Sequence, residues 1–443
     1  MRKQITAAAL TLALCSSLLA APAQAAAFTP DNPSSAASSV PDAVNAAGGT
    51  SEQVTAEKEL FPADAEGTVS FENLEKRVRE NYPTLLALQE TIETINAIDY
   101  DKLYDDLRDQ MATIAKTQWI MIDDGPDGDF VREYLGVEYD SYTYSTMDSA
   151  YDTLRDTFED LKEGKLQADN ERAKQQLENA CEQVVVGAQT LYIAILEMQN
   201  TRASLQRQLD ALDRSLAEME IRHKYGQISA LTLQQVQNGR VQLASGIATL
   251  DMNISNYTCQ LEVMLGLSPT GALSLTEIPA VTSQQVAEMT EFDVALTAAK
   301  EKSHELYEAQ QTLDDAEETF RTDKKASGGL QSYKYKTAYH TYEAAKYTYQ
   351  ATIQNFELNF RTVYTAVADY QQTLTAAESA LEYQRSSYAA TELKYQHGSI
   401  SKNALLTAQD ELATAENNVL TARHNLFTAY HNYQLAVENG ILN

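Results

Sequence analysis

The feature that most constrains the fold is an internal repeat with an offset of 172 residues. The segment "RHKYGQISALTLQQVQ" (222–237) returns in altered form as "LKYQHGSISKNALLTAQ" (393–409). The aligned pairs are Tyr192 with Tyr364, Ala194 with Ala366, Leu209 with Leu381, Gly226 with Gly398, Ile228 with Ile400, Ser229 with Ser401, Leu233 with Leu405 and Gln237 with Gln409. A repeat of this length predicts two copies of one supersecondary unit.

Each copy is dominated by a helical pattern with a period close to 3.5. The clearest seam steps by three and four through Leu405, Ala408, Leu412, Ala415, Val419, Ala422, Leu426, Ala429, Tyr433 and Ala436. Such a heptad seam is typical of packed helices, and alternation of a large residue with alanine favours close antiparallel pairing. The sequence therefore predicts an all-α fold of long antiparallel coiled-coil hairpins in two tandem repeats.

Similar seams run elsewhere, at 205–219, 243–264 and 335–374, the last rich in tyrosine. A tyrosine cluster could also stack on cell-wall sugars, but heptad positions favour packing in half-buried sites. A second apolar line, through Leu406, Ala413, Leu420 and Phe427, lies beside the first seam of 405–436. Two lines predict neighbours on both sides of that helix, as in a bundle or the wall of a helical barrel.

The repeated glycines predict the bends of the hairpins. Gly226 and Gly398 would form the tips, with Ser229 and Ser401 capping the helices that follow. Gly266 and Gly440 fall near the ends of the return helices, where glycine is a favoured cap.

The first 25 residues have the pattern of a secretory signal peptide, with a charged start, an apolar core and a small-residue cleavage site. Residues 26–69 are rich in Ala, Ser, Pro and acid and predict a flexible leader. No later segment has the ~18 apolar residues of a transmembrane helix. We therefore expect an exported protein, and its net charge of −29 argues against nucleic acid as a partner.

Two cysteines remain beyond the signal peptide, Cys181 and Cys259, and they form no disulfide framework. Folding the first hairpin at its tip places Cys259 opposite a residue near position 199. The axial offset from Cys181 is then roughly 27 Å, too far for a disulfide. We expect both thiols to stay free.

Catalytic and metal-site patterns are missing from the sequence. The six histidines are His223, His304, His340, His397, His424 and His431, and none has strong metal-site spacing or a triad or phosphate-loop context. His424 and His431 are seven residues apart and could share a metal, although heptad position explains the spacing equally. The expectation is a protein that is not an enzyme and has no cofactor or metal.

Together these features resemble the TolC family of outer-membrane efflux proteins. The resemblance rests on two repeats of this size, on a G-x-I-S tip in each, and on "SFENLEKRVRENYPTLLALQETI" (70–92), which is similar to the family's opening helices. It divides the mature chain into repeat 1 at 70–280, with an insertion near 119–150, and repeat 2 at 281–443.

The resemblance implies a homotrimer whose helices form a hollow barrel in the cell envelope. It would act as an efflux conduit for small molecules or peptides, joined to a periplasmic adaptor protein and an inner-membrane transporter. The implied docking residues are Gly226, Gln227, Ile228, Ser229, Gly398, Ser399, Ile400 and Ser401. Two alternatives stay open: the tips could be plain tight turns, and the protein a non-pore extracytoplasmic coiled-coil scaffold or spacer.

Two departures from the family matter. No acidic residue follows the tips at Thr232, Gln235, Ala404 or Thr407, where a charged gate would lie. The insertion points, at 137–144 and 321–334, lack the ~9 to 11 alternating residues of a membrane-spanning strand. The expectation is a family member with little or no β-barrel, from an envelope that need not have an ordinary outer membrane.

Overall fold

The computed structural model describes residues 64–65, 67–122, 129–130, 133–134, 141–326 and 332–442. The contacts divide the chain into two units, Met1–Glu59 and Leu60–Asn443, and all described residues belong to the second. The predicted signal peptide and nearly all of the predicted leader lie outside the described residues.

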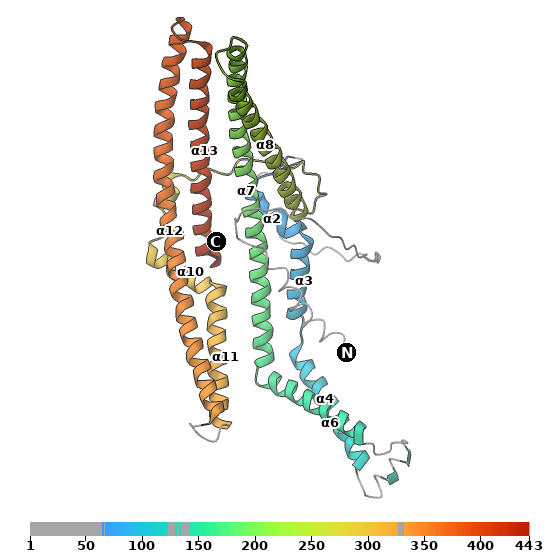
Figure 1. Ribbon diagram of the computed structural model, residues 1–443. Helices are drawn as coiled ribbons and strands as arrows, with labels where there is room; N and C mark the ends of the chain where they lie inside the picture. Colours follow the sequence, from blue (N-terminus) through green and yellow to red (C-terminus); the bar gives the residue numbers. More distant parts are fainter. Residues whose placement is uncertain are drawn as a thin grey trace. The chain divides into compact units, whose positions relative to one another are not determined.

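The described part is almost wholly helical, which confirms the all-α prediction (Figure 1). The helices are α2 (Phe71–Asn81), α3 (Pro83–Asn96), α4 (Tyr100–Ile122), α6 (Ser141–Lys162), α7 (Lys165–Lys224), α8 (Ala230–Met264), α9 (Ser283–Ala287), α10 (Phe292–Lys302), α11 (His304–Ala326), α12 (Tyr333–Gln396) and α13 (Lys402–Asn439). The strands within the described ranges, β1 (Thr68–Val69) and β2 (Ser274–Leu275), form one short parallel pair.

Two long hairpins organise these helices, α7 with α8 and α12 with α13. Helix α7 has 60 residues and α12 has 64, so each is longer than its return helix. Shorter helices cover the rest of each long helix. Helices α2 and α3 pack on α7, and α11 packs on α12. Each repeat is therefore built around one long helix, against which its other helices pack.

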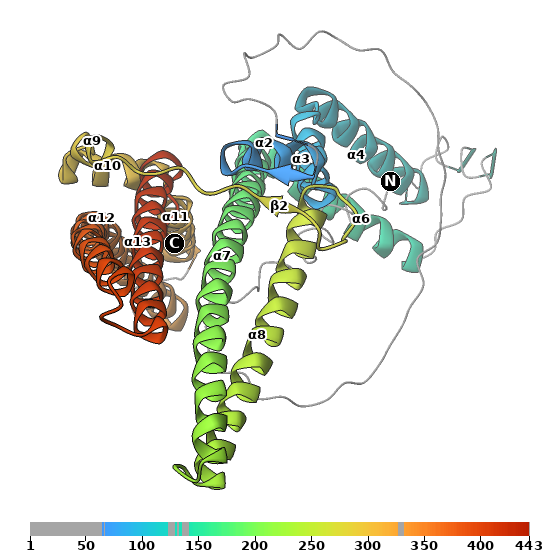
Figure 2. The ribbon, with the colours of Figure 1, turned by 90° about the horizontal axis from the view of Figure 1, so that it is seen from above.

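The hairpins join through α13, which contacts both α12 and α7. Seen from above, α13 lies between these two helices (Figure 2). Seven of the predicted seam residues of α13 are buried: Ala408, Val419, Ala422, Leu426, Ala429, Tyr433 and Ala436. Phe427, from the second predicted line, is buried in the core of the first repeat, at 4.9 Å ring to ring from Phe71. The prediction of neighbours on both sides of this helix is confirmed.

Other seam assignments were wrong in detail. The seams predicted at 243–264 and 335–374 include Tyr257, Tyr339 and Tyr370, yet all three are exposed within the single chain. Within one chain, α8 and α12 have a single long partner each, so part of each apolar surface has no cover. The predicted hairpin register also shifts by about a turn, because Arg202 pairs with Asp251 at 2.6 Å and Arg240 with Asp213 at 2.5 Å. Cys259 then lies opposite a residue near 194, and both cysteines are free.

The two insertion points are occupied by helices in the described ranges. In repeat 1, α4 packs against α6, and in repeat 2, α11 packs against the start of α12. Parts of both segments, including 135–140 and 327–331, lie outside the described residues. In the portion of the chain that can be described, no helix combines the length and the apolar character needed to cross a membrane.

Candidate functional site

The two hairpin tips have the same backbone. At the first, the Gly226 amide donates to the His223 carbonyl at 2.9 Å and the Gln227 amide to the Arg222 carbonyl at 2.9 Å. At the second, the Gly398 amide donates to Tyr395 and the Ser399 amide to Lys394, both at 2.8 Å. These are the paired bonds of a Schellman motif, which needs a residue with positive φ.

Glycine supplies that conformation at both tips, with φ of 71° at Gly226 and 70° at Gly398. Ser229 then caps α8, accepting a hydrogen bond from the Thr232 amide at 3.1 Å. Ser401 caps α13 in the same way, accepting from the Ala404 amide at 3.2 Å. Both caps were predicted from the sequence and are confirmed.

The isoleucine of each tip is half-buried, unlike its neighbours. Residues 225–227 and 397–399 are exposed, whereas Ile228 and Ile400 are partly covered. Each precedes the N-cap and is followed five positions later by a half-buried leucine, which is the spacing of a hydrophobic staple. The isoleucines therefore help to set the direction of the return helix, while part of each side chain remains exposed.

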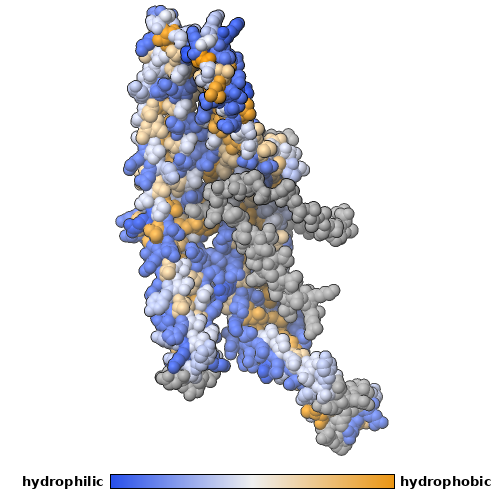
Figure 3. Space-filling model, in the orientation of Figure 1, coloured by the Kyte–Doolittle hydropathy of each residue, from blue (hydrophilic) through white to orange (hydrophobic). Residues whose placement is uncertain are grey.

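Other apolar side chains near the tips are more exposed than the isoleucines. Tyr225 and Leu231 at the first tip have 74% and 67% of their surface exposed. Ile221 lies beside them, and Leu393 and Tyr395 are the exposed apolar residues of the second tip. Figure 3 shows apolar surface among polar residues at this end of the hairpins. These positions carry different residues in the two repeats, so the repeat does not identify them in the sequence.

The tips lack the acidic excess of the whole chain. Residues 221–235 contain Arg222 and Lys224 and no acid, and residues 393–407 contain Lys394 and Lys402 and no acid. The whole chain has a net charge of −29. Glu218 forms an ion pair with Arg222, and Glu220 and Glu392 adjoin these segments. Since exposed charges act over about 10 Å at 0.1 M salt, a partner at the tips meets a nearly balanced charge rather than the charge of the whole chain.

Polar contacts join α7 and α13, the helices next to the two tips. Arg214 forms an ion pair with Asp410, Arg207 donates to Asn417 at 2.8 Å, and Asn200 donates to Thr421 at 3.1 Å. Nearest the tips, Asn403 donates to Glu218 at 3.3 Å. The α7 residues Asn200, Arg207 and Arg214 are spaced by seven, so polar residues at heptad spacing in the sequence could have indicated this interface.

A cavity of about 380 Å³ opens where these two helices meet β2. It is lined by Leu196, Gln199, Asn200, Ala203, Arg207, Leu275, Glu277, Ala413, Glu416, Asn417, Leu420 and His424. His424 is buried at its edge, and burial lowers its pKa.

The structure gives the two closely spaced histidines separate environments. His431 lies 3.0 Å from the Gln189 side chain through Nε2, stacks near Phe427, and burial lowers its pKa to about 4. No group of three potential metal ligands occurs in the described ranges. Packing of each ring at a heptad position accounts for their spacing.

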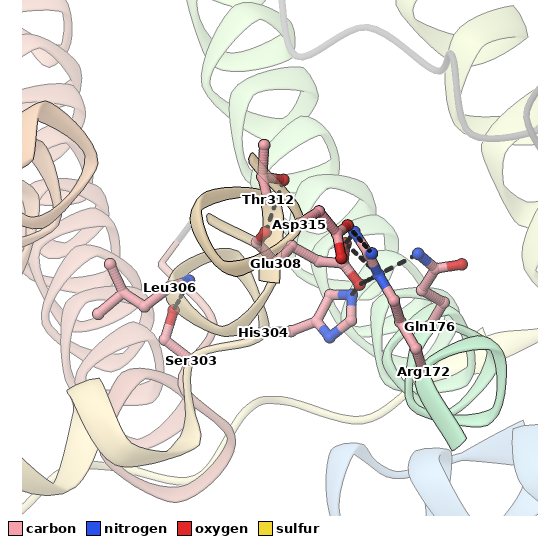
Figure 4. A network of polar contacts seen from close by, with 8 residues as sticks. All are labelled: Arg172, Gln176, Ser303, His304, Leu306, Glu308, Thr312 and Asp315. Carbon is pink, nitrogen blue, oxygen red and sulfur yellow. Dashed lines mark hydrogen bonds and ion pairs between the residues drawn. The ribbon is translucent and has the colours of Figure 1, made fainter. Parts of the chain in front are cut away.

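A separate polar network fixes the other end of α7 to α11 (Figure 4). Arg172 pairs with Glu308 at 2.7 Å and with Asp315 at 3.0 Å, and Gln176 also donates to Glu308 at 3.0 Å. Burial alone would raise the pKa of Glu308, but the hydrogen bonds from Arg172 and Gln176 outweigh it and lower that pKa. This network joins the two repeats far from the tips along α7.

Comparisons with known proteins agree with this architecture. Residues 326–436 match the family model "Outer membrane efflux protein". The outer-membrane channel OprN has a similar structure, with a TM-score of 0.51 and 12% identity over 83% of this chain and 90% of that chain. For CmeC of Campylobacter jejuni the TM-score is 0.46 and the identity 13%, over 65% of this chain and 68% of that chain. For VceC of Vibrio cholerae the TM-score is 0.45 and the identity 12%, over 84% of this chain and 96% of that chain. No curated protein matches the chain.

The family match covers most of α12 and α13, and therefore includes the second tip. The likeness to OprN extends the shared fold over both repeats. Both comparisons lead to channels and neither to an enzyme. The resemblance read from the repeat and its tips is confirmed: residues 326–436 match the outer membrane efflux protein family, and the described chain has the helical fold of the outer-membrane channel OprN.

Proposed function

We propose that this chain is one subunit of a homotrimeric efflux conduit in the cell envelope, and that its hairpin tips dock a periplasmic adaptor protein linked to an inner-membrane transporter. The observation that carries the docking role is the pair of tips, which share one backbone and lie on helices in direct contact. The family match supports a role in efflux, and the resemblance implies small molecules or peptides as the exported class.

The chemistry of the tips supports a helical protein partner. Exposed glycines let another backbone approach closely. Tyr225 and Leu231 provide apolar contact, and aromatic residues are common anchors of protein interfaces. The nearly balanced charge of the tips favours a partner that docks mainly through an apolar ridge.

Uncovered apolar positions support assembly with further copies. Val241, Met252 and Val263 are exposed on α8 and follow one another at eleven residues, close to three helical turns. They therefore line one face of that helix. Leu358 and Tyr383 are exposed on α12. A second copy of the chain would cover these positions and complete the helical wall.

The test is adaptor capture by tip variants, using the adaptor encoded in the same genomic neighbourhood. Ile228→Asp with Ile400→Asp should abolish capture, because a charge would have to be desolvated in an apolar contact. Since these isoleucines are half-buried, Tyr225→Asp with Leu231→Asp provides a second variant at exposed positions. Val294→Asp, an equally polar change at an exposed site on α10, is the matched control.

Loss of capture by both tip variants, with thermal melts like that of the control, would support docking. Unchanged capture by the Tyr225 and Leu231 variant would exclude these exposed residues as docking contacts. Unchanged capture by both variants would remove the docking role and favour the scaffold alternative.

A further inference from the structure

The end of the α11–α12 hairpin is a basic island in an acidic chain. Residues 321–347 contain six lysines and arginines but only two acids, against a net charge of −29 for the whole sequence. Aromatic contacts fix this end: Phe320 stacks on Tyr342 at 5.6 Å, Lys324 lies 5.9 Å from the Phe320 ring centre, and Lys346 lies 5.6 Å from that of Tyr342. The charge is therefore carried by an ordered pair of helices.

One face of α12 at this end points away from α11. Tyr333, Lys336, His340, Ala344 and Tyr347 follow at three and four residues, and all five are exposed. Tyr333 and Tyr347 show 84% and 66% of their surface. We call these five residues the basic tyrosine face.

Lysines at and beside the face have no acidic partner within the described chain. Among the residues that can be described, Lys325, Lys334 and Lys336 form no ion pair, whereas Lys346 pairs with Glu343 at 3.1 Å. All three are exposed. This part of the hairpin thus offers positive charge and tyrosine rings that its own chain leaves uncovered.

An acidic stripe with matching dimensions lies on α6 of repeat 1. Asp148, Asp152, Asp156 and Glu159 are exposed at intervals of three and four residues, and so share one face over about 16 Å. Arg155 lies among them and pairs with Asp152 at 3.1 Å, which leaves the stripe negative. The basic tyrosine face extends over about 21 Å by the same helical rise.

Both faces lie at the same end of α7. Helix α6 ends just before α7 begins, separated by Glu163 and Gly164. Arg172, in the first turns of α7, binds Glu308 and Asp315 of α11, the helix that packs on this part of α12. Copies arranged around one axis keep their axial level, so the stripe of one copy and the face of the next would meet at equal height.

We propose that the basic tyrosine face of α12, with Lys325 and Lys334 beside it, docks on the acidic α6 stripe of a neighbouring copy of this chain. The inference rests on the proposed homotrimer and names the surfaces that close it. The contact is heterologous, since different patches meet, and such contacts form rings when the rotation closes. Their complementary charge would ensure that the basic tyrosine face of one copy meets the acidic stripe of the next, and not another basic tyrosine face.

The test reverses charges in the full mature chain and measures the trimer by mass photometry over a dilution series. Lys325→Glu, Lys334→Glu and Lys336→Glu together should raise the concentration at which the trimer dissociates at least tenfold. Adding Asp148→Lys, Asp152→Lys and Asp156→Lys to the same chain should restore it, because every copy then carries the swapped pair. The matched control, Lys224→Glu, Lys394→Glu and Lys402→Glu, changes the charge equally at the tips and should leave the trimer intact.

Dissociation no different from the control, or no rescue by the second set of reversals, would overturn the inference. Adaptor capture tests the proposed function independently, since the tips are unchanged in the α12 variant. If that variant remains trimeric but loses binding to vesicles with 30 mol% phosphatidylglycerol, the face serves an anionic membrane and the inference fails. Should the variant not fold, the Lys→Gln triple replaces it, with the same expected loss of trimer.

Discussion

Four glycines with one backbone conformation provide a graded test of the packing. Gly226, Gly266, Gly398 and Gly440 all have φ between 68° and 71°, and they occupy equivalent positions in the two repeats. Their surroundings differ. A Cβ on either tip glycine would meet nothing within 4 Å, whereas one on Gly266 would lie 2.8 Å from the Asn81 carbonyl oxygen. At Gly440 it would overlap the backbone carbonyl group of Lys302.

The cost of alanine follows from these distances. An L-residue in the left-handed region costs roughly 1–2 kcal/mol, offset by about 0.4–1 kcal/mol from the stiffer unfolded chain. Gly398→Ala should therefore destabilise by about 1 kcal/mol. At Gly440 the clash is with backbone at the α10–α11 junction, which no side-chain rotation relieves, so overpacking adds about 2–3 kcal/mol. Gly266→Ala should fall between them.

Urea unfolding at one protein concentration, followed by circular dichroism, gives the four free energies. The expected order of destabilisation is Gly226 and Gly398 lowest and equal, then Gly266, then Gly440. Equal losses of unfolding free energy in Gly398→Ala and Gly440→Ala would show that α13 does not end against the α10–α11 junction. A larger loss at the tips would refute the open surroundings on which the docking proposal depends.

Three further predictions concern single contacts. Cys181 and Cys259 should give no disulfide-linked peptide by nonreduced mass spectrometry, and Cys181 should alkylate more slowly because burial raises its pKa. Glu262→Gln should cost about 3 kcal/mol at pH 7, since two of the N–H donors of loop 270–273 would face an amide NH₂. Burial alone would raise the pKa of Glu262, but the hydrogen bonds from this loop outweigh it and lower that pKa. The stabilisation by these bonds is therefore present above about pH 4.3 and is lost as pH falls through the pKa of the folded state. In urea unfolding, the difference in unfolding free energy between the wild type and Glu262→Gln should be smaller at pH 3 than at pH 7. Arg172→Met should destabilise by about 1–2 kcal/mol and speed amide exchange in α11, and unchanged exchange there would contradict the role given to the network.

The repeat and its periodicity predicted the helical hairpins because both are local properties of the sequence. A seam with period 3.5 fixes which face of a helix is buried, and this succeeded for α13 from Ala408 to Ala436. It did not fix which helix covers that face. The same pattern assigned Tyr257 to a core, although α8 exposes it within the single chain.

The tips were located from the sequence, but their surroundings were not. A G-x-I-S pattern predicts the turn and its cap, since both depend on neighbouring residues. Contact between α7 and α13, which carry the tips, depends on Arg214 meeting Asp410, which are 196 residues apart. The partial burial of Ile228 likewise depends on the staple geometry rather than on hydrophobicity alone.

The oligomeric state of the mature protein tests the central claim most directly. If two hairpins per chain build the wall of a conduit, light scattering at micromolar concentration should give three times the chain mass, and electron microscopy of the same sample should show a hollow ring in end view. A stable monomer at that concentration, with the exposed faces of α8 and α12 left in water, would contradict the conduit and with it the proposed function.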